Sequence, residues 1–195
     1  MARKKTAAAP LIPWWQLRIE LLDVSPKVWR RLIVPEDLKL PKLDRILQIC
    51  MGWTNSHLHA FTLGGKHYSH YDPEWAAELK HLDEKRIELF KAIGYECRCF
   101  DYIYDFGDSW HHTVIVENAH AGHSGQDLRI RCLGGENACP PEDVGGTHGY
   151  ADFLAAIADP SHEEHARYLE WVGGSFEPTR FDITAVNLLL DSIKP

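Results

Sequence analysis

The segment from Tyr104 to His112, YDFGDSWHH, places several side chains that could do chemistry close together in the chain. Asp105 and Asp108 supply carboxylates, which bind cations and transfer protons, and His112 supplies an imidazole for the same purposes. The same residue types also build tight turns, because Gly107 tolerates a left-handed backbone and aspartates bond to nearby backbone amides. We favour a turn between two strands, with a catalytic role as the alternative.

The segment HLH, from His57 to His59, suggests a metal site. On a strand, alternate side chains project from the same face, so both imidazoles would point the same way. Two imidazoles and one carboxylate, for which we select Asp105, form a ligand set that suits zinc or manganese. Phe61 and Leu63 continue the same face, so the alternative is that both rings border the core.

The segment CPPEDVGGTHGY, from Cys139 to Tyr150, forms a third candidate. Its prolines stiffen the backbone, and its paired glycines permit a sharp turn. Glu142 and Asp143 then present adjacent carboxylates that could ligate a cation or hold a basic group of a partner. The alternative is a simple entry into a helix that begins near Thr147.

The five cysteines give little support to a zinc site or to disulfides. The spacings between Cys97 and Cys99 and between Cys132 and Cys139 differ from the usual zinc-knuckle spacing of two intervening residues. An odd number of cysteines without an export signal is typical of reduced thiols. We therefore expect a cytoplasmic protein with free thiols.

Length and charge narrow the class of protein. The 195 residues suit a single domain, expected over 14–195, preceded by a flexible basic tail over 1–13. The net charge is -7, and three of the basic residues lie in the tail, so the domain itself is more acidic still. General DNA binding is therefore disfavoured, because it depends on cationic contacts with phosphates. No apolar run is long enough for a membrane helix.

The periodicity of apolar residues predicts the elements that must position these candidates. Strand periods over 15–21 and 28–34 indicate a hairpin, and Leu43, Ile46, Leu47 and Cys50 form the stripe of a helix. Strand periods return over 56–68, around a turn at Gly64, and again over 99–104 and 110–117. Residues 74–79 and 86–93 read as short amphipathic pieces.

The second half of the chain predicts loops and helices, in contrast to the strands of the first half. Residues 119–146 are rich in glycine and proline and predict a long loop. Helical periods follow over 150–157, after Pro160 and over 186–193. Together these elements predict an α+β fold: a β-grasp-like antiparallel or mixed sheet with one crossing helix, followed by a C-terminal helical part.

Five runs of residues together resemble one known family. They are LLDVSPKVWRRLIVP, LQICMGWTNSHLHAF, YIYDFGDSWHHTV, CLGGENACPPEDVGGTHGY and YLEWVGGSFEPTRFD, which span most of the chain in the order of the family. The chain is similar to the plasmid ORF-three-like family, which was first named from a root-inducing plasmid and is also called the insertion-element passenger TnpR family. The resemblance implies a compact α+β domain, often encoded near mobile elements, whose biochemical role is not established.

The resemblance also implies that the polar candidates belong together. They fall within family motifs on three separate segments, so the fold could gather them into one polar pocket with an aromatic rim. The expected pocket residues are His57, His59, Asp105, Asp108, Trp110, His112, Glu142, Asp143 and Tyr150. Trp53 would join the rim. The name TnpR suggests a resolvase, but we find neither a nucleophilic serine in a catalytic motif nor a basic helix that reads DNA.

Three functions remain open from the sequence. The first is a non-enzymatic binding or adaptor module that holds a protein or small-molecule partner in the aromatic-rimmed pocket. The second is a metal-dependent hydrolase, acting for example on phosphoesters. In it His57, His59 and Asp105 or Asp108 hold the ion, and His112 or Glu142 acts as general base. The third is a DNA-associated accessory protein. Whether the protein is an enzyme is left open.

Overall fold

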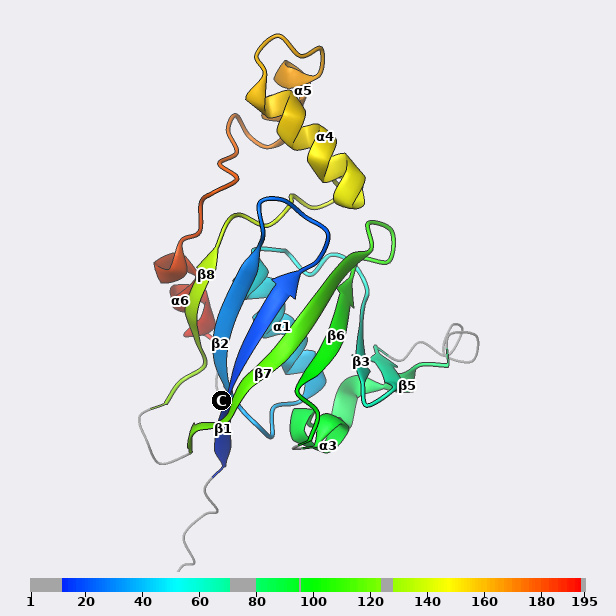
Figure 1. Ribbon diagram of the computed structural model, residues 1–195, viewed down its shortest axis with the longest axis vertical. Coiled ribbons are helices and arrows are strands. Elements are labelled where there is room, and N and C mark those ends of the chain that lie inside the picture. The colour runs from blue at the N-terminus through cyan, green and yellow to red at the C-terminus, as the bar shows by residue number, and fades with distance from the viewer. Residues whose placement is uncertain (1–11, 71–79, 95, 124–127, 194–195) are drawn as a thin grey trace, which may run out of the picture.

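The centre of the molecule is an eight-stranded mixed sheet, seen in a computed structural model that describes residues 12–70, 80–94, 96–123 and 128–193 (Figure 1). The strands lie in the order β5-β4-β3-β6-β7-β1-β2-β8. All neighbours pair antiparallel except β4 and β5. Their bounds are β1 Pro13–Leu21, β2 Trp29–Pro35, β3 His59–Leu63, β4 Lys66–Ser69, β5 Leu82–Asp83, β6 Cys99–Tyr104, β7 Trp110–His123 and β8 Arg131–Glu136.

The two faces of the sheet differ in polarity. On β1, Trp15, Leu17 and Ile19 are buried, whereas the alternate residues Arg18 and Glu20 form an ion pair of 2.6 Å. This alternation is the pattern of an antiparallel sheet with one face on the core and one toward water. The expected α+β class is confirmed.

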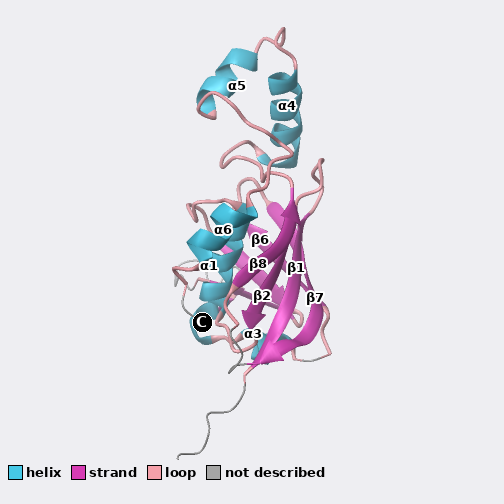
Figure 2. Cartoon of the chain, turned by 90° about the vertical axis from the view of Figure 1, so that its left-hand side faces the viewer, coloured by secondary structure: helices cyan, strands magenta, loops and turns pink. Residues whose placement is uncertain are grey.

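Helices cover the apolar face (Figure 2). Helix α1, Leu40–Met51, buries the predicted stripe of Leu43, Ile46, Leu47 and Cys50 and ends at Gly52, whose φ is 98°. Helix α6, Ile183–Leu190, lies beside α1. A short 3₁₀ helix, η1 Glu84–Arg86, contacts α1, and helix α3, Leu89–Ile93, follows it in the chain.

Helix α6 also protects the edge strand β8. The side chain of Asn187 accepts a hydrogen bond from Cys132 N at 2.9 Å and donates one to Cys132 O at 2.9 Å. Arg131 pairs with Asp191 at 2.6 Å. The Asn187 hydrogen bonds occupy backbone groups that an exposed edge would otherwise offer to another chain.

Helices α4, Gly146–Ala158, and α5, His165–Trp171, project from one end of the sheet as a helical arm (yellow and orange in Figure 1). The arm has an aromatic cluster of its own around Phe153, whose ring centroid lies 5.3 Å from Tyr168 and 5.2 Å from Phe176. Trp171 packs against the same ring at 5.9 Å. These contacts hold α4 and α5 together.

Several details differ from the sequence expectations. Residues 119–123 continue β7 and residues 131–136 form β8, so the prediction of an unbroken loop over 119–146 is wrong. Strand β1 begins at Pro13, inside the range expected for the tail. The amphipathic piece 74–79 lies outside the described residues. The β-grasp-like arrangement and the single-domain boundary stay predictions. In the described part of the chain, no helix is long and apolar enough to cross a membrane.

Candidate functional site

The turn between β6 and β7 brings Asp105 to the loop that precedes β3. Asp105 has a left-handed backbone, with φ of 56°, and its Oδ1 accepts a hydrogen bond from Gly107 N at 2.9 Å. Its own backbone N–H donates to Leu58 O at 2.8 Å. The segment is therefore a turn between two strands, as the residue types predicted. It also contacts the segment that carries His57.

The loop that follows α1 presents His57 at the same place. Ser56 N donates to the hydroxyl of Tyr104 at 3.0 Å, and Asn55 N donates to Gln48 Oε1 at 3.2 Å. Asn55 has a φ of 58°, which asparagine tolerates better than most residues. These bonds tie the loop to α1 and to β6 just before the imidazole, and the bond from Asp105 N to Leu58 O ties it just after.

The segment Pro140–Asp143 follows β8, the strand at the opposite edge of the sheet, and lies beside the other two segments. Trp53 Nε1 donates to Pro140 O at 3.0 Å. Glu142 Oε1 accepts hydrogen bonds from Thr54 N at 2.8 Å, Thr54 Oγ1 at 2.9 Å and the hydroxyl of Tyr104 at 3.0 Å. Burial raises the pKa of Tyr104, and the charge of Glu142 adds to the rise, so the phenol stays protonated as a donor.

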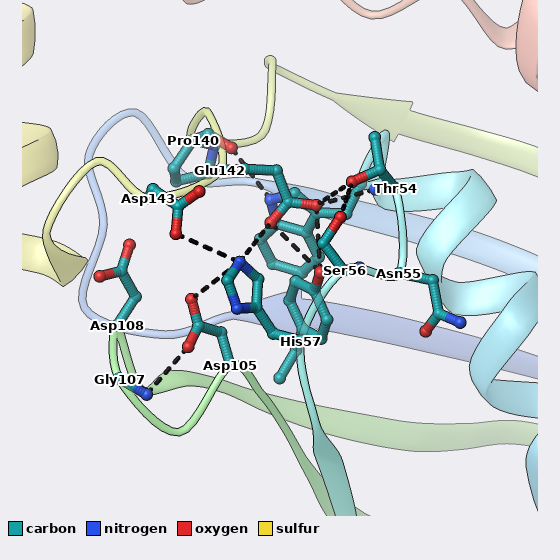
Figure 3. A network of polar contacts seen from close by, with 12 residues as sticks. Thr54, Asn55, Ser56, His57, Asp105, Gly107, Asp108, Pro140, Glu142 and Asp143 are labelled. Atoms are coloured by element: carbon teal, nitrogen blue, oxygen red, sulfur yellow. Dashed lines mark hydrogen bonds and ion pairs between the residues drawn. The ribbon is translucent and has the colours of Figure 1, made fainter.

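These three segments place three carboxylates around one imidazole nitrogen (Figure 3). His57 Nε2 lies 3.2 Å from Asp143 Oδ1, 3.7 Å from Asp105 Oδ2 and 3.9 Å from Glu142 Oε2. We call these four residues the His57 cluster. One ligand atom each from His57, Asp105 and Asp143 lie within 4.8 Å of one another.

The three carboxylates of the His57 cluster have little positive charge beside them. Among the described residues, no lysine or arginine pairs with its carboxylates. His57 Nε2 is buried and forms no hydrogen bond of good geometry with any described residue. The side chain of Asp105 is only 8% exposed, whereas that of Asp143 is 71% exposed. The cluster is closed on one side and open to solvent on the other.

His59 does not join the His57 cluster. Strand β3 begins at His59, so His57 lies in the preceding loop, where the alternation of a strand does not apply. His59 Nδ1 lies 3.3 Å from Asp44 Oδ1, and Nε2 lies 3.0 Å from Glu84 Oε2, so both nitrogens are occupied. The structure therefore does not bring His59 together with His57 and Asp105, as the expected metal set required; the side chain that joins those two is Asp143.

His59 sits in a buried polar network of its own. Tyr102 donates a hydrogen bond to Asp44 Oδ1 at 2.7 Å and accepts one from Gln48 Nε2 at 2.8 Å. Burial by itself would lower the pKa of His59, but the hydrogen bond to Glu84 and the charge of Asp44 raise it above its usual value. This network joins α1, β3, β6 and η1.

His112 is a core residue. It is 1% exposed, and its Nδ1 lies 3.2 Å from Tyr102 O. Burial lowers the pKa of His112 to about 3, so the ring is neutral. Its ring centroid lies 5.3 Å from that of Trp53. A general base facing solvent cannot come from this side chain, which corrects one expectation for the hydrolase.

The other expected pocket residues divide between packing and anchoring. Trp110 and Tyr150 are 0% and 1% exposed, so they pack beneath the site and do not form its rim. Trp110 stacks on Trp53 with centroids 6.2 Å apart. Asp108 Oδ2 accepts a hydrogen bond from Gly145 N at 3.1 Å, so Asp108 anchors the start of the helical arm.

A groove of about 760 Å³ adjoins the cluster, with Glu142 and Asp143 on its rim. It runs between the helices that cover the sheet and the helical arm. Its apolar walls are Trp53, Trp171, Phe176, Phe181 and Leu189, of which Trp171 is 46% exposed. Sequence reasoning expected Trp53 at the site but missed the other walls. The signal was present, since the run YLEWVGGSFEPTRFD holds three of the aromatic residues.

Comparison with known proteins gives a family but no activity. A family model described as "Plasmid pRiA4b ORF-3-like protein" matches residues 14–185. The "Uncharacterized protein y4hQ" of Sinorhizobium fredii (strain NBRC 101917 / NGR234) is 38% identical over 182 residues, which cover 91% of each chain. A crystal structure titled as a protein of unknown function, MM3350 from Methanosarcina mazei Go1, has a TM-score of 0.78 and 29% identity, covering 90% of this chain and 98% of the other.

Proposed function

This chain belongs to the plasmid pRiA4b ORF-3-like family, and we propose that it is a binding module that holds a divalent cation, zinc or manganese, at the rim of its groove. The observation that carries the proposal is the approach of three carboxylates to His57 Nε2 without a lysine or arginine among the described residues. Ligand oxygens of Asp105 and Asp143 lie within 4.8 Å of each other, and like charges this close destabilise one another unless a cation or a proton lies between them.

The ligand types suit such an ion. Zinc and manganese accept imidazole nitrogen together with carboxylate oxygen. His57, Asp105 and Asp143 would supply three protein ligands, which leaves further coordination positions for a partner. The ion would polarise a carbonyl, carboxylate or phosphate group of a ligand.

The groove supplies the remaining part of a binding site. Its volume of about 760 Å³ lies in the range of pockets for small molecules or for a short segment of a partner. Trp53, Trp171, Phe176 and Phe181 offer apolar contact area, and the His57 cluster offers polar contacts at one end. A ligand could therefore combine an apolar body in the groove with an anionic group at the ion.

Calorimetric titration tests the cation site. Protein without an affinity tag, stripped with a chelator, should bind one equivalent of Zn²⁺ or Mn²⁺. His57→Ala and Asp105→Asn should each weaken binding by at least about tenfold, because loss of even an outer-shell partner of a metal ligand costs about 10- to 100-fold and loss of a ligand costs no less. The matched control is His111→Ala, which removes an exposed histidine outside the cluster.

The titration has clear contrary outcomes. Protein that binds neither ion contradicts the proposal. So does binding that His57→Ala and Asp105→Asn leave unchanged, because the ion would then lie elsewhere. Circular dichroism of each variant establishes that the fold survives.

A metal-dependent hydrolase is the second candidate, and the position of Glu142 favours it. Its Oε2 lies 3.9 Å from His57 Nε2, and hydrogen bonds from Thr54 and Tyr104 fix Oε1. A carboxylate held beside an ion can act as general base on a water molecule.

Hydrolysis of p-nitrophenyl phosphate distinguishes the two functions. For an enzyme, Glu142→Gln should lower the metal-dependent rate by at least about 100-fold while the ion still binds, because general bases contribute that much. The exposed Glu170→Gln on α5 serves as control. If the wild-type protein with Zn²⁺ or Mn²⁺ shows no turnover, the hydrolase is contradicted and the binding module is favoured.

A further inference from the structure

The groove between the helical arm and the helices that cover the sheet leaves large apolar side chains open to solvent. Trp171 on α5 is 46% exposed and Leu189 on α6 is 57% exposed, and both line the groove. Phe176 and Phe181, from the segment that joins these two helices, line it as well. Apolar side chains that gather along one groove mark a surface for contact with another molecule, whereas single exposed apolar residues do not.

The negative charge of the chain is concentrated around the same groove. Residues 140–193, which form the helical arm, α6 and their connections to β8, contain ten acidic and two basic residues, a formal charge of -8. The whole chain carries -7, so the other residues together are nearly neutral. A surface of one sign attracts partners of the opposite sign and repels those of its own sign. The surroundings of the groove therefore favour a basic partner over a nucleic acid.

Two of these carboxylates line the groove outside the His57 cluster. Glu177 Oε1 accepts a hydrogen bond from Thr179 Oγ1 at 2.7 Å, which lowers the pKa of Glu177 and keeps it ionised. Asp182 Oδ1 accepts one from Ala185 N at 2.9 Å and caps α6. Within the described part of the chain, neither carboxylate forms an ion pair with a lysine or arginine. Both can therefore pair with a basic side chain of a partner.

The arginines of the groove do not balance these charges. Arg30 is 2% exposed and donates to four backbone carbonyl oxygens at 2.7 to 2.8 Å, so the fold itself holds its guanidinium. Arg180 is exposed on the rim. Against these two cations, the groove is lined by the four carboxylates of Glu142, Asp143, Glu177 and Asp182. The local charge thus has the same sign as that of the whole region.

We propose that the groove docks a short segment of a protein partner in which large apolar side chains are flanked by lysine or arginine. The apolar side chains contact Trp171 and Leu189, and the basic side chains lie against Glu177 and Asp182. The volume of about 760 Å³ suits such a segment. The proposal is separate from the cation site, because the residues on which it depends lie outside the His57 cluster.

Selection from a phage-displayed library of random peptides of about 12 residues tests the docking surface. The bait is the full chain, immobilised through a biotin on its N-terminus. The selected peptides should share two or more large apolar residues with lysine or arginine on either side. A synthetic copy of the most enriched peptide, labelled with fluorescein, then gives the affinity by fluorescence anisotropy. Its dissociation constant should rise at least about threefold between 50 and 300 mM NaCl, because salt screens exposed charges.

Variants of the groove establish where the peptide binds. Leu189→Gln should weaken binding at least about tenfold, because an apolar anchor at the centre of an interface contributes that much. The matched control is Leu188→Gln on the same helix, since Leu188 is 68% exposed but does not line the groove. Glu177→Gln combined with Asp182→Asn should reduce the salt dependence, and asparagine still caps α6. Circular dichroism establishes that each variant is folded.

Several outcomes overturn the proposal. They are a selection that enriches no peptide, a shared pattern that is acidic or lacks apolar residues, and an equal loss for Leu188→Gln and Leu189→Gln. Sedimentation velocity examines a second copy as the occupant: a dimer that only Leu189→Gln dissociates contradicts a separate partner. The basic residues of the tail are a further alternative. If replacing Arg3, Lys4 and Lys5 by glutamine raises the peptide affinity tenfold, the tail itself occupies the groove.

Discussion

Two histidines separated by one residue occupy different electrostatic surroundings. His57 faces three carboxylates at an opening of the molecule, whereas His59, with a side chain 10% exposed, lies between Asp44 and Glu84. Both carboxylates of the second site are themselves 5% exposed or less. A buried ion pair of this kind is costly to break, because removing one partner leaves buried charge without compensation.

His59→Gln tests the buried triad. The folded-state pKa of His59 is raised, so its contribution to stability is complete below the usual value of about 6.5 and is lost as pH rises through the folded-state pKa. The variant should lose about 3 kcal/mol of unfolding free energy near pH 6, and less at pH 9. Urea unfolding at pH 6, 7, 8 and 9 measures the difference. His111→Gln should leave the pH dependence of the wild-type protein intact, and an equal loss for His59→Gln at every pH would contradict this account.

The secondary-structure elements were largely predictable, because their periodicity is local. The stripe of α1 and the alternation of β1 each lie within one element, and the turn at Gly64 lies between β3 and β4. Strand β8 was not predictable in this way. Its run RCLGGE carries two glycines and is half-exposed beside β2, so neither period is visible. Its strand state depends on pairing with β2 and on Asn187, a residue 55 positions away.

Two glycines at the start of the helical arm are required by close contacts that only the folded structure shows. A Cβ on Gly149 would lie 2.0 Å from Val144 O, and one on Gly146 would lie 2.7 Å from Asp108 O. The first turn of α4 is therefore pressed against the segment that carries Asp143 and against the β6–β7 turn. From the sequence, Gly146 indicated only a sharp turn and Gly149 carried no such prediction. Asp108 is distant in the chain, and the approach of Val144 O to Gly149 depends on how that turn folds.

At the scale of the whole molecule, the candidate site is created by the tertiary structure, which brings distant segments together. The motifs identified most of the polar residues, but the choice between His59 and Asp143 as the third ligand depended on where β3 begins. The groove walls on α5 and α6 depended on how the arm and α6 sit on the body. Neither is a property of any one segment. The proposed cation binding would therefore depend on folding, since the proposed ligands come from three separate parts of the chain.

This interdependence predicts that the ion stabilises the folded protein as a whole. The unfolded chain cannot hold His57, Asp105 and Asp143 together, so a cation that binds only the folded state adds about 2.7 kcal/mol at 100 times its dissociation constant. For a chain of this size that corresponds to a rise in Tm of about 5 to 10 °C. Differential scanning calorimetry with Mn²⁺ measures the shift, and Mn²⁺ is preferable to Zn²⁺ because it binds the thiols of an unfolded chain less well. Chelator should reverse the rise, and Asp105→Asn should reduce it to about half or less, as a loss of at least about tenfold in affinity requires, while His111→Ala retains it. An equal rise in the Asp105→Asn variant would mean that the ion stabilises the protein at some other place.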